Sequence, residues 1–556
     1  MNRAFSRTTF FLSTFSTTIV LGLTVVLAGC VSHSGTSGSS ALSGQKVSLH
    51  KLGRYQTRIF DESAAEIAAY SPKTQSLYVV DGGENSIDVI DISDPASPVK
   101  RAELQAGALG SGIQSVDVAH GLVAVAVENK DSQHFNRQNN GLVAFFDVVT
   151  NQPLGQVTVG SLPDMVKFTK DGQKLLVANE GEPCLDYLCD PKGSVSVIDL
   201  SRGVNHARTM TLGFDDFSAD ALRARQVRIR PGSTPAEDLE PEYITISDDN
   251  QTAWVALQEN NALAVIDLKH NRLKTITGLG YKNHALPGQG LDGNDKDKRA
   301  DIRQWPVMGM YQPDGISGCR INGRNYVLTA NEGDGREYSE DKKDPHYNPA
   351  ANDEVRIADV KLDPDKFPNA QKIQHVKHGI GRLKIARDMG DTDGDGDYDQ
   401  LYSFGARSFS IFDADGRLVS DSGDDFEQIT AQRYPKHFNA SNTKNKIDNR
   451  SDNKGPEPEN VVCYQHHQAT YAFVGLERIG GIMIYNISDP TQPVFVDYIN
   501  DRDFSAEPKK LVPAGKGGDL GPEGLLIIPA AHSPTQTALL VTANEVSGST
   551  TIYEIR

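Results

Sequence analysis

The chain has 556 residues and a formal net charge of −17, with 73 acidic residues against 56 basic ones. This acidic surface disfavours nucleic acid and anionic membrane surfaces as partners, and it favours cations or a basic ligand. The length alone would indicate several domains.

Residues 1–29 are predicted to be a targeting segment rather than part of the fold. The segment starts basic and carries no charge over positions 10–27, a run long enough for a membrane-spanning helix, which is the alternative. The sequence Leu27-Ala28-Gly29-Cys30 resembles a bacterial lipobox, in which cleavage leaves Cys30 as a lipidated N-terminus. We therefore expect a lipoprotein signal peptide.

Residues 30–46 form a Ser/Gly-rich stretch that is predicted to be a flexible tether between the lipid on Cys30 and the folded domain. The expected partner of this end of the chain is a membrane, and the expected location is the extracytoplasmic side of the cell envelope. Val31 follows the lipidated cysteine where an inner-membrane retention signal would place aspartate, so the outer membrane is favoured over the inner one.

Residues 47–556 contain seven repeats of a short-strand pattern, and such a period indicates a propeller or a solenoid. In each unit a strand begins after an acidic residue, a second apolar strand runs into another acidic residue, and a third strand follows. Short strands at regular spacing with turn residues between them predict an all-β, seven-bladed β-propeller. The alternative, a β-helix or open solenoid, needs capping repeats, which the sequence does not show.

The two ends of the domain predict how the ring closes. The last unit stops at its third strand, and an unassigned strand over Arg54–Phe60 precedes the first unit. Placing that strand at the outer edge of the last blade closes the ring and covers an exposed edge.

The Pro-Asp/Glu strand starts, the three Ala-Asn-Glu strand ends and the GARSFSIF segment over Gly405–Phe412 resemble the choice-of-anchor I propeller family. The resemblance covers about Tyr55 to Arg556. Members of that family are sometimes labelled alkaline phosphatase-like, and the resemblance therefore implies a metal-dependent phosphoric ester hydrolase as one activity.

The register of the repeat predicts two rings of carboxylates at one mouth of the central channel. Adjacent strands of a blade are antiparallel, so the start of the first strand and the end of the second lie at the same edge. The strand starts are Glu66, Asp117, Asp164, Glu242, Asp314, Glu459 and Glu523. The strand ends are Asp81, Glu128, Glu180, Glu259, Glu332, Glu477 and Glu545.

Like charges at this density repel by several kcal/mol for a pair ~4 Å apart at an effective dielectric constant of ~20. Protons or cations would relieve the repulsion, and Ca²⁺ suits a site of many oxygen ligands. The alternative is that each carboxylate accepts backbone N–H bonds from the next blade and only holds neighbouring blades together.

Phosphoester hydrolysis would need a cation near the phosphate in addition to metal-bound water. Arg407 and Arg336, with Glu332 as a carboxylate beside them, are the predicted catalytic residues, and Arg478 is a third candidate cation. The alternative for each arginine is a salt bridge to the acidic rings.

A second cation site is predicted in the loop Asp391-Thr-Asp393-Gly-Asp395-Gly-Asp397-Tyr-Asp399. Alternate oxygens around a tight glycine turn wrap one Ca²⁺, as in the first half of an EF-hand loop. Such an ion would be structural and stiffen a hairpin. A merely acidic, solvated turn is the alternative.

Four cysteines remain after Cys30, an even number in an oxidising compartment. Cys184 and Cys189 are close enough in sequence to close a small loop. Cys319 and Cys463 follow the strand starts of adjacent blades at similar distances, so a bridge between blades is the expected second disulfide.

Three polar insertions, 269–312, 337–400 and 421–456, interrupt the repeat and are expected to cover or shape a site. Two functions follow from the sequence. The first is a Ca²⁺-dependent phosphoesterase at the acidic mouth, and the second is a non-catalytic cell-surface binding or scaffold propeller. A monomer is expected in either case.

Overall fold

The computed structural model describes residues 47–129, 139–184, 187, 189–337 and 352–556. The predicted signal peptide, Cys30 and the tether lie outside these residues. Over the described ranges, no helix has both the length and the apolar character needed to cross a membrane.

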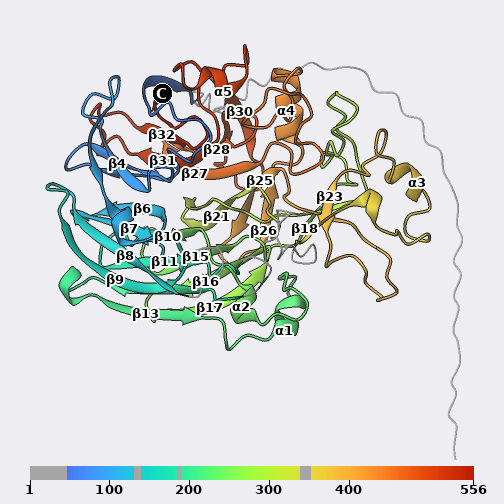
Figure 1. Cartoon of the computed structure of the whole chain (residues 1–556), viewed down its shortest axis with the longest axis horizontal. Coiled ribbons are helices and arrows are strands. Elements are labelled where there is room, and N and C mark those ends of the chain that lie inside the picture. The colour runs from blue at the N-terminus through green and yellow to red at the C-terminus, as the bar shows by residue number, and fades with distance from the viewer. Residues whose placement is uncertain (1–46, 130–138, 185–186, 188, 338–351) are drawn as a thin grey trace, which may run out of the picture. The chain divides into compact units, whose positions relative to one another are not determined.

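Seven antiparallel sheets of four strands each contain most of the strands of the described chain (Figure 1). Sheet one contains β2 (Ala68–Ser71), β3 (Ser76–Asp81), β4 (Ser86–Asp91) and β5 (Val99–Leu104). Sheet two contains β6 (Ile113–Ala119), β7 (Leu122–Val127), β8 (Asn140–Asp147) and β9 (Pro153–Ser161). Sheet three contains β10 (Pro163–Phe168), β11 (Lys174–Asn179), β12 (Ser194–Asp199) and β13 (Arg208–Gly213).

The next three sheets repeat this order, with a long interruption in the middle one. Sheet four contains β14 (Ile244–Ile246), β15 (Thr252–Leu257), β16 (Ala262–Asp267) and β17 (Arg272–Gly278). Sheet five contains β20 (Ile316–Ile321), β21 (Arg324–Asn331), β25 (Ser408–Asp413) and β26 (Leu418–Asp421). Sheet six contains β27 (Pro458–His466), β28 (Ala469–Leu476), β29 (Ile482–Asn486) and β30 (Val494–Ile499).

Sheet seven joins the two ends of the domain. It contains β31 (Pro522–Ile528), β32 (Leu539–Asn544), β33 (Ser549–Ile555) and β1 (Leu49–Gln56). β1 pairs antiparallel with β33, from Leu49 opposite Ile555 to Gln56 opposite Ser549. The N-terminal strand therefore occupies the outer edge of the last sheet, and it begins at Leu49 rather than at Arg54.

The sequence of each strand fits its depth in its sheet. The second and third strands are mainly apolar and buried on both faces, as in SLYVVD of β3, because neighbouring sheets cover both faces. The outer strands alternate between exposed and half-buried residues, as in VKRAEL of β5. The first strand of each sheet packs against the first strand of the next, and β31 packs against β2.

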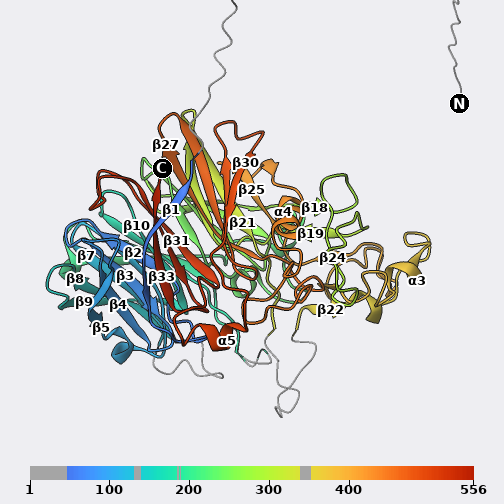
Figure 2. The ribbon, with the colours of Figure 1, turned by 90° about the horizontal axis from the view of Figure 1, so that it is seen from above.

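The insertions build an additional five-stranded sheet beyond sheet five (Figure 2). Its strands are, in spatial order, β18 (Tyr281–Asn283), β19 (Met308–Met310), β24 (Tyr402–Ser403), β23 (Lys384–Ala386) and β22 (Glu354–Arg356). The stretch 269–312 is not wholly an insertion, because β17 lies inside it. Outer strands have one solvent-facing side, so their polar residues resemble a loop in the sequence.

The described helices are short. They are α1 (Ala219–Arg223), α2 (Pro235–Asp238), α3 (Ala370–Ile373), α4 (Asp425–Arg433) and α5 (Pro508–Leu511). α4 lies in the third insertion, and its Phe426 packs with Phe409 of β25 and Tyr485 of β29. This apolar contact attaches the third insertion to sheets five and six.

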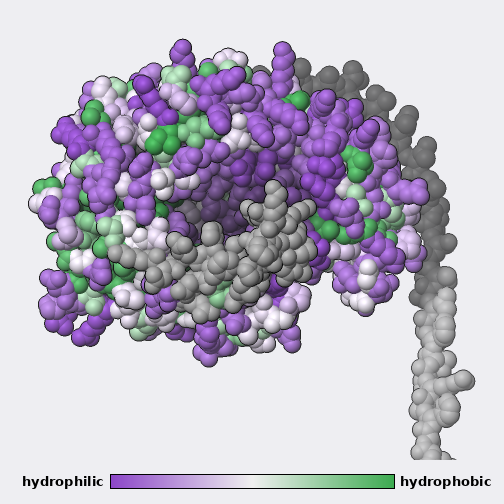
Figure 3. All heavy atoms as spheres, in the orientation of Figure 1, coloured by the Kyte–Doolittle hydropathy of each residue, from purple (hydrophilic) through white to green (hydrophobic). Residues whose placement is uncertain are grey.

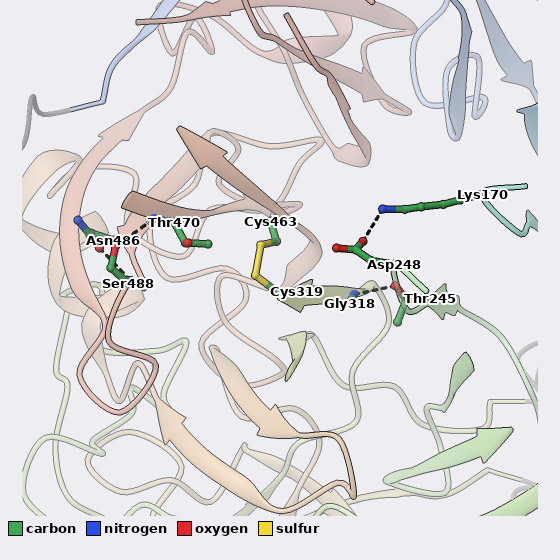
Figure 4. Close-up of a disulfide and its surroundings, with 9 residues drawn as sticks. All are labelled: Lys170, Thr245, Asp248, Gly318, Cys319, Cys463, Thr470, Asn486 and Ser488. Atoms are coloured by element: carbon green, nitrogen blue, oxygen red, sulfur yellow. Dashed lines mark hydrogen bonds and ion pairs between the residues drawn. A yellow bond between two sulfur atoms is a disulfide. The ribbon is translucent and has the colours of Figure 1, made fainter. Parts of the chain in front are cut away.

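Two disulfides are present in the structure, with the pairing given in the sequence analysis. Cys184 pairs with Cys189, and Cys319 pairs with Cys463, with Cα–Cα distances of 5.1 and 5.7 Å. Figure 4 shows the second bridge between β20 of sheet five and β27 of sheet six. It therefore ties two consecutive sheets together at their first strands.

Loss of this bridge should lower stability. The Cys319→Ser/Cys463→Ser double variant is expected to lose about 2–4 kcal/mol of unfolding free energy, because the bridge closes a long loop in the unfolded chain. The measurement is urea denaturation of oxidised wild type and variant. A Cys184→Ser/Cys189→Ser variant is the matched control and should lose less, because its loop is short (sequence separation 5 against 144). Equal losses in the two variants would contradict this reasoning.

Candidate metal centre

A β-bulge at the start of the first strand aims an acidic side chain out of the sheet. In β10 the register shifts between Pro163 and Met165, so Asp164 has no partner in β11. β31 shifts in the same way around Glu523, and β27 shifts between Pro458 and Val461, which leaves Glu459 unpaired. Bulges of this kind re-aim side chains and recur next to binding sites.

The bulge in β6 changes one member of the predicted ring. The register shift between Ile113 and Ser115 gives the bulge position to Gln114. Asp117 lies further along β6, opposite Ala124, where its Oδ2 accepts a hydrogen bond of 2.8 Å from the Phe168 N–H. Asp117 is therefore not equivalent to Asp164, Glu459 and Glu523. The alignment of the units relied on an acidic residue at this position, and here the position is occupied by Gln114.

The residue before each of these strand starts accepts a backbone bond from the strand-end carboxylate residue. Thus Glu180 N–H donates to Leu162 O, Glu477 N–H to Glu457 O, and Glu545 N–H to Gly521 O. Leu162, Glu457 and Gly521 all have left-handed backbone, with φ of 46, 51 and 65°. Only one of the three is glycine, so Leu162 and Glu457 hold a conformation that L-residues avoid.

Three carboxylates from consecutive sheets meet in one group, which we name the Asp314 triad. Oxygen atoms of Asp314, Glu459 and Glu523 lie within 4.8 Å of one another. Burial and the neighbouring carboxylates raise the pKa of both Glu459 and Glu523 well above the usual range. Burial also raises the pKa of Asp314 to about 7.

The Asp314 triad has no cation in direct contact with it among the described side chains. No N–H or O–H donor contacts Oε2 of Glu459, which is 7 % exposed. Asn460, the next residue, donates through Nδ2 to Tyr243 Oη at 3.0 Å and leaves its Oδ1 without a partner. Burial and the nearby Asp314 and Glu523 raise the pKa of Tyr243.

A second group, the Glu457 triad, contains Glu332, Glu457 and Glu477, again within 4.8 Å. Cationic side chains surround this one. Lys454 Nζ lies 2.7 Å from Glu332, and Arg450 Nε lies 2.7 Å from Glu457. Arg478 reaches both Glu457 and Glu477 at 2.7 Å.

The two triads therefore differ in how their charge is balanced. In the Glu457 triad, burial alone would raise the pKa of Glu457, but Arg478, Arg450 and Lys454 outweigh it and hold that pKa well below the usual range. The Asp314 triad forms no ion pair among the described residues, and Lys454 acts on Asp314 only at longer range, so its oxygens need protons or a bound cation.

The other predicted ring members lie around these triads. Burial raises the pKa of Glu66, Asp164 and Glu545 to about 7, and that of Asp81 to about 6. Glu242 and Glu259 share a side-chain hydrogen bond, and burial raises the pKa of Glu242 well above its usual value. Glu128 accepts bonds from Gln114 and Ser111. Glu180 follows β11 at the same edge.

Arg407 forms its hydrogen bonds away from the carboxylates of the predicted rings. Its Nη1 donates to Glu427 Oε1 and Asp292 O, both at 2.6 Å, and its Nη2 donates to Ser451 O and Asn453 O. Gly405, with φ of 70°, positions this turn, because a Cβ there would lie 2.0 Å from Glu332 O. Arg407 thus anchors the third insertion, and both of its terminal nitrogens are used in doing so.

Most donors of Arg336 are also used, in this case by acidic residues of the segment that precedes sheet four. Its Nε donates to Glu240 Oε2 at 2.9 Å, and its Nη2 donates to Asp238 O at 2.8 Å. Its Nη1 lies 3.7 Å from Asp238 Oδ1 and contacts no acceptor at hydrogen-bond distance. Among the described contacts, Nη1 of Arg336 is the one terminal nitrogen of the two predicted catalytic arginines that donates no hydrogen bond.

The aspartate loop lies between β23 and β24, which pair at Ile385 and Ser403. Asp391, Asp393 and Asp399 bring carboxylate oxygens within 4.8 Å of one another. Asp391 accepts bonds from Gly394 N–H at 2.8 Å and Gly396 N–H at 3.0 Å. Asp397 belongs to a neighbouring group with Asp363 and Asp399, also within 4.8 Å, and its Oδ2 lies 2.8 Å from Lys361 Nζ.

Sequence reasoning missed Glu457, Lys454 and Arg450. Glu457 immediately precedes the Pro458-Glu459 strand start, and the signal that could have found it is the repeat itself. The same position is occupied by Leu162 and Gly521 in other units, so a buried acid there is unusual. Lys454 and Arg450 lie in an insertion, where no periodicity assigns them a place.

These sheets and carboxylates define a β-propeller-like domain with an acidic interior. The chain belongs to the choice-of-anchor I domain family, which matches residues 66–490. Gigasin-3a of Magallana gigas is 31 % identical over 205 residues, which is 34 % of this chain and 70 % of that protein. The mesenchyme-specific cell surface glycoprotein of Strongylocentrotus purpuratus is 25 % identical over 345 residues, 55 % of this chain and 44 % of that protein.

The solved structures that align with the chain include a β-propeller domain. The β-propeller domain of Cps50 (Swd1) from Myceliophteria thermophila aligns with a TM-score of 0.39 and 8 % identity, covering 92 % of this chain and 100 % of that one. Hydrazine synthase of Kuenenia stuttgartiensis aligns with a TM-score of 0.44 and 12 % identity, covering 89 % and 96 %.

Proposed function

We propose that this domain is a surface-located, divalent-cation-binding propeller whose principal site is the Asp314 triad. The observation that carries the proposal is a group of three carboxylates, Glu459 buried and Asp314 and Glu523 half-buried, with which no cationic side chain of the described residues forms an ion pair. The seven sheets are its blades, and the contacts from β2 through to β31 and back to β2 close them into one ring.

Calcium is the cation that this donor set suits best. Carboxylate oxygens of Asp314, Glu459 and Glu523 are hard ligands, and the free Oδ1 of Asn460 adds an amide oxygen nearby. Ca²⁺ accepts six to eight oxygens in loose geometry, whereas Mg²⁺ demands a tight octahedron. The group Asp391, Asp393 and Asp399 is the proposed second, structural Ca²⁺ site.

A surface location is supported by the family and by the similarity to the Strongylocentrotus cell surface glycoprotein. We propose that lipidated Cys30 and the tether hold the domain on the outer membrane. A phosphoesterase remains the second candidate activity. The free Nη1 of Arg336 is the observation in its favour, and the engagement of Arg407 weighs against the residue set predicted for it.

Calcium titration of variants tests the principal site. The Glu459→Gln/Glu523→Gln variant is expected to bind Ca²⁺ at the Asp314 triad at least about tenfold more weakly, because charged ligands contribute about 1.5–3 kcal/mol each. Isothermal titration of chelator-stripped protein measures affinity and stoichiometry.

The matched control is Asp391→Asn/Asp393→Asn, which should remove the loop site and leave the triad site. Because glutamine also relieves repulsion, the triad variant should stay folded, which circular dichroism checks. Unchanged calcium stoichiometry and affinity in a folded triad variant would contradict the proposal.

A further inference from the structure

A polar cleft of about 460 Å³ opens beside the Glu457 triad. Figure 3 shows a hollow of hydrophilic side chains on one face of the domain. Apart from one glycine, every residue lining the cleft is charged or carries a polar side chain. The lining residues are Glu182, Glu259, Asp334, Gly335, Arg336, Glu337, Glu354, Lys384, Arg450, Asn453, Lys454 and Arg478.

Arg450 and Arg478 are held side by side on this cleft by one carboxylate. Arg450 donates from Nε and Nη2 to Glu457, at 2.7 and 3.0 Å. Arg478 donates from Nε to Glu457 Oε2 at 2.7 Å, and its Nη1 meets Glu477. The arginine side chains are 21 and 22 % exposed, whereas the Glu457 side chain is fully buried.

This arrangement leaves donors that no side chain of the described chain uses. Arg450 Nη1 and Arg478 Nη2 have no hydrogen-bond or ion-pair partner there. The third free donor on the cleft is Nη1 of Arg336, a residue that is only 2 % exposed. Of these three donors, Nη1 of Arg336 is buried, and buried donors are nearly always satisfied in folded proteins, so it indicates a ligand with acceptor oxygens. Arg450 and Arg478 offer two further, partly exposed donors on the same cleft.

The charge of the surroundings also favours an anion. Burial raises the pKa of Glu477 to about 8 and that of Glu332 to about 7, so these carboxylates are partly protonated at neutral pH. Burial likewise raises the pKa of Glu354, across the cleft, to about 8. Arg450, Arg478 and Lys454 keep their charge throughout, and Glu457 and Asp334 are the other carboxylates in contact with them.

We propose that the cleft binds a small oxyanion, a phosphate or a carboxylate, carried on a hydroxylated molecule and seated between Arg450 and Arg478. Planar guanidinium groups present paired N–H donors that match the oxygens of either anion. The polar lining excludes an apolar ligand body, and the volume suits a molecule the size of a sugar ring or two, since ligand pockets span roughly 300–1,000 Å³. This site is separate from the Asp314 triad and needs no metal.

Binding of defined probes tests the site, with chelator present so that the cation sites are silent. Glucose 6-phosphate and glucuronate represent the two anions on a sugar, inorganic phosphate represents the anion alone, and glucose is the neutral counterpart. We expect wild-type protein to bind both sugar anions, to bind phosphate more weakly and to ignore glucose in isothermal titration.

Two variants separate recognition from folding. Arg450→Gln/Arg478→Gln should weaken the sugar anions at least about tenfold, as expected for lost charged hydrogen bonds. Arg450→Lys/Arg478→Lys keeps both charges and ion pairs but removes the paired donors, so it should stay folded and still lose affinity. Arg417→Gln, at an exposed turn, is the control and should bind as wild type.

Failure of wild-type protein to bind either sugar anion would overturn the proposal. Unchanged affinity in a folded lysine variant would overturn it as well, because the free guanidinium donors would then play no part. Neither result bears on calcium titration at the Asp314 triad, so the two proposals can fail independently.

Discussion

Replacing Glu457 by glutamine is expected to lower the free energy of unfolding by about 3–5 kcal/mol, the usual effect of removing one partner from a buried ion pair. Glutamine keeps the size of the side chain but not its charge. Arg450, Arg478 and Lys454 would then face one another around a neutral group. Urea denaturation at pH 7.5 measures the change.

The same carboxylate gives this prediction a pH signature. The pKa of Glu457 is held far below its ordinary value of 4.5 in the folded state. Its contribution to stability is therefore complete above the unfolded pKa and is lost as the pH falls below it. The wild-type and variant curves should converge in acid.

An exposed glutamate provides the matched control. Glu84→Gln lies in the turn after β3 and should leave the unfolding free energy within about 0.5 kcal/mol of wild type. A loss below about 1 kcal/mol for Glu457→Gln would show that its ion pairs behave as surface pairs.

The second large effect is a fall in stability as the pH rises. Burial raises the pKa of Glu66 and Asp164 to about 7, from ordinary values of 4.5 and 3.8. The folded state therefore binds more protons than the unfolded state between these values. Stability must decrease with rising pH across the same window, by up to about 1.4 kcal/mol per pH unit for each group.

Melting temperatures between pH 5 and pH 8, recorded in chelator, measure this slope. The Glu66→Gln/Asp164→Asn variant should flatten it, because amides do not release protons. Asp147→Asn is the control, since backbone bonds from Thr150 lower the pKa of that exposed carboxyl and it titrates below the window. A wild-type melting temperature that rises from pH 5 to pH 8 would contradict the prediction.

The repeated strand pattern allows the sheets to be predicted from the sequence. Apolar second strands such as LYVVD and LLVANE recur because every sheet is covered on both faces, and that period is visible without a structure. Which residue of a unit joins the carboxylate ring is harder to predict, because a bulge shifts the strand register by one residue and leaves no mark in the pattern of apolar residues. Gln114 and Asp117 show the consequence.

In the candidate site, the residues that belong to the repeat could be predicted, and those in the insertions could not. The members of the Asp314 triad start their strands in three units of the repeat, so the register alone predicts that they converge. Lys454 meets Glu332 across 122 residues of sequence, and Arg407 meets Glu427 through the fold of an insertion. Such contacts depend on tertiary packing, which no local pattern encodes.

The pairing of β1 with β33 has a consequence for how the chain is made. A ribosome releases β1 before any other strand of the domain, and its partner emerges only after the other six sheets. Until then β1 has an unpaired edge, which is prone to pair with other chains. Its own residues limit that hazard, because Lys51 and Arg54 place positive charge along the strand. These charges therefore reduce association of the nascent chain with other chains until β33 is synthesised and pairs with β1.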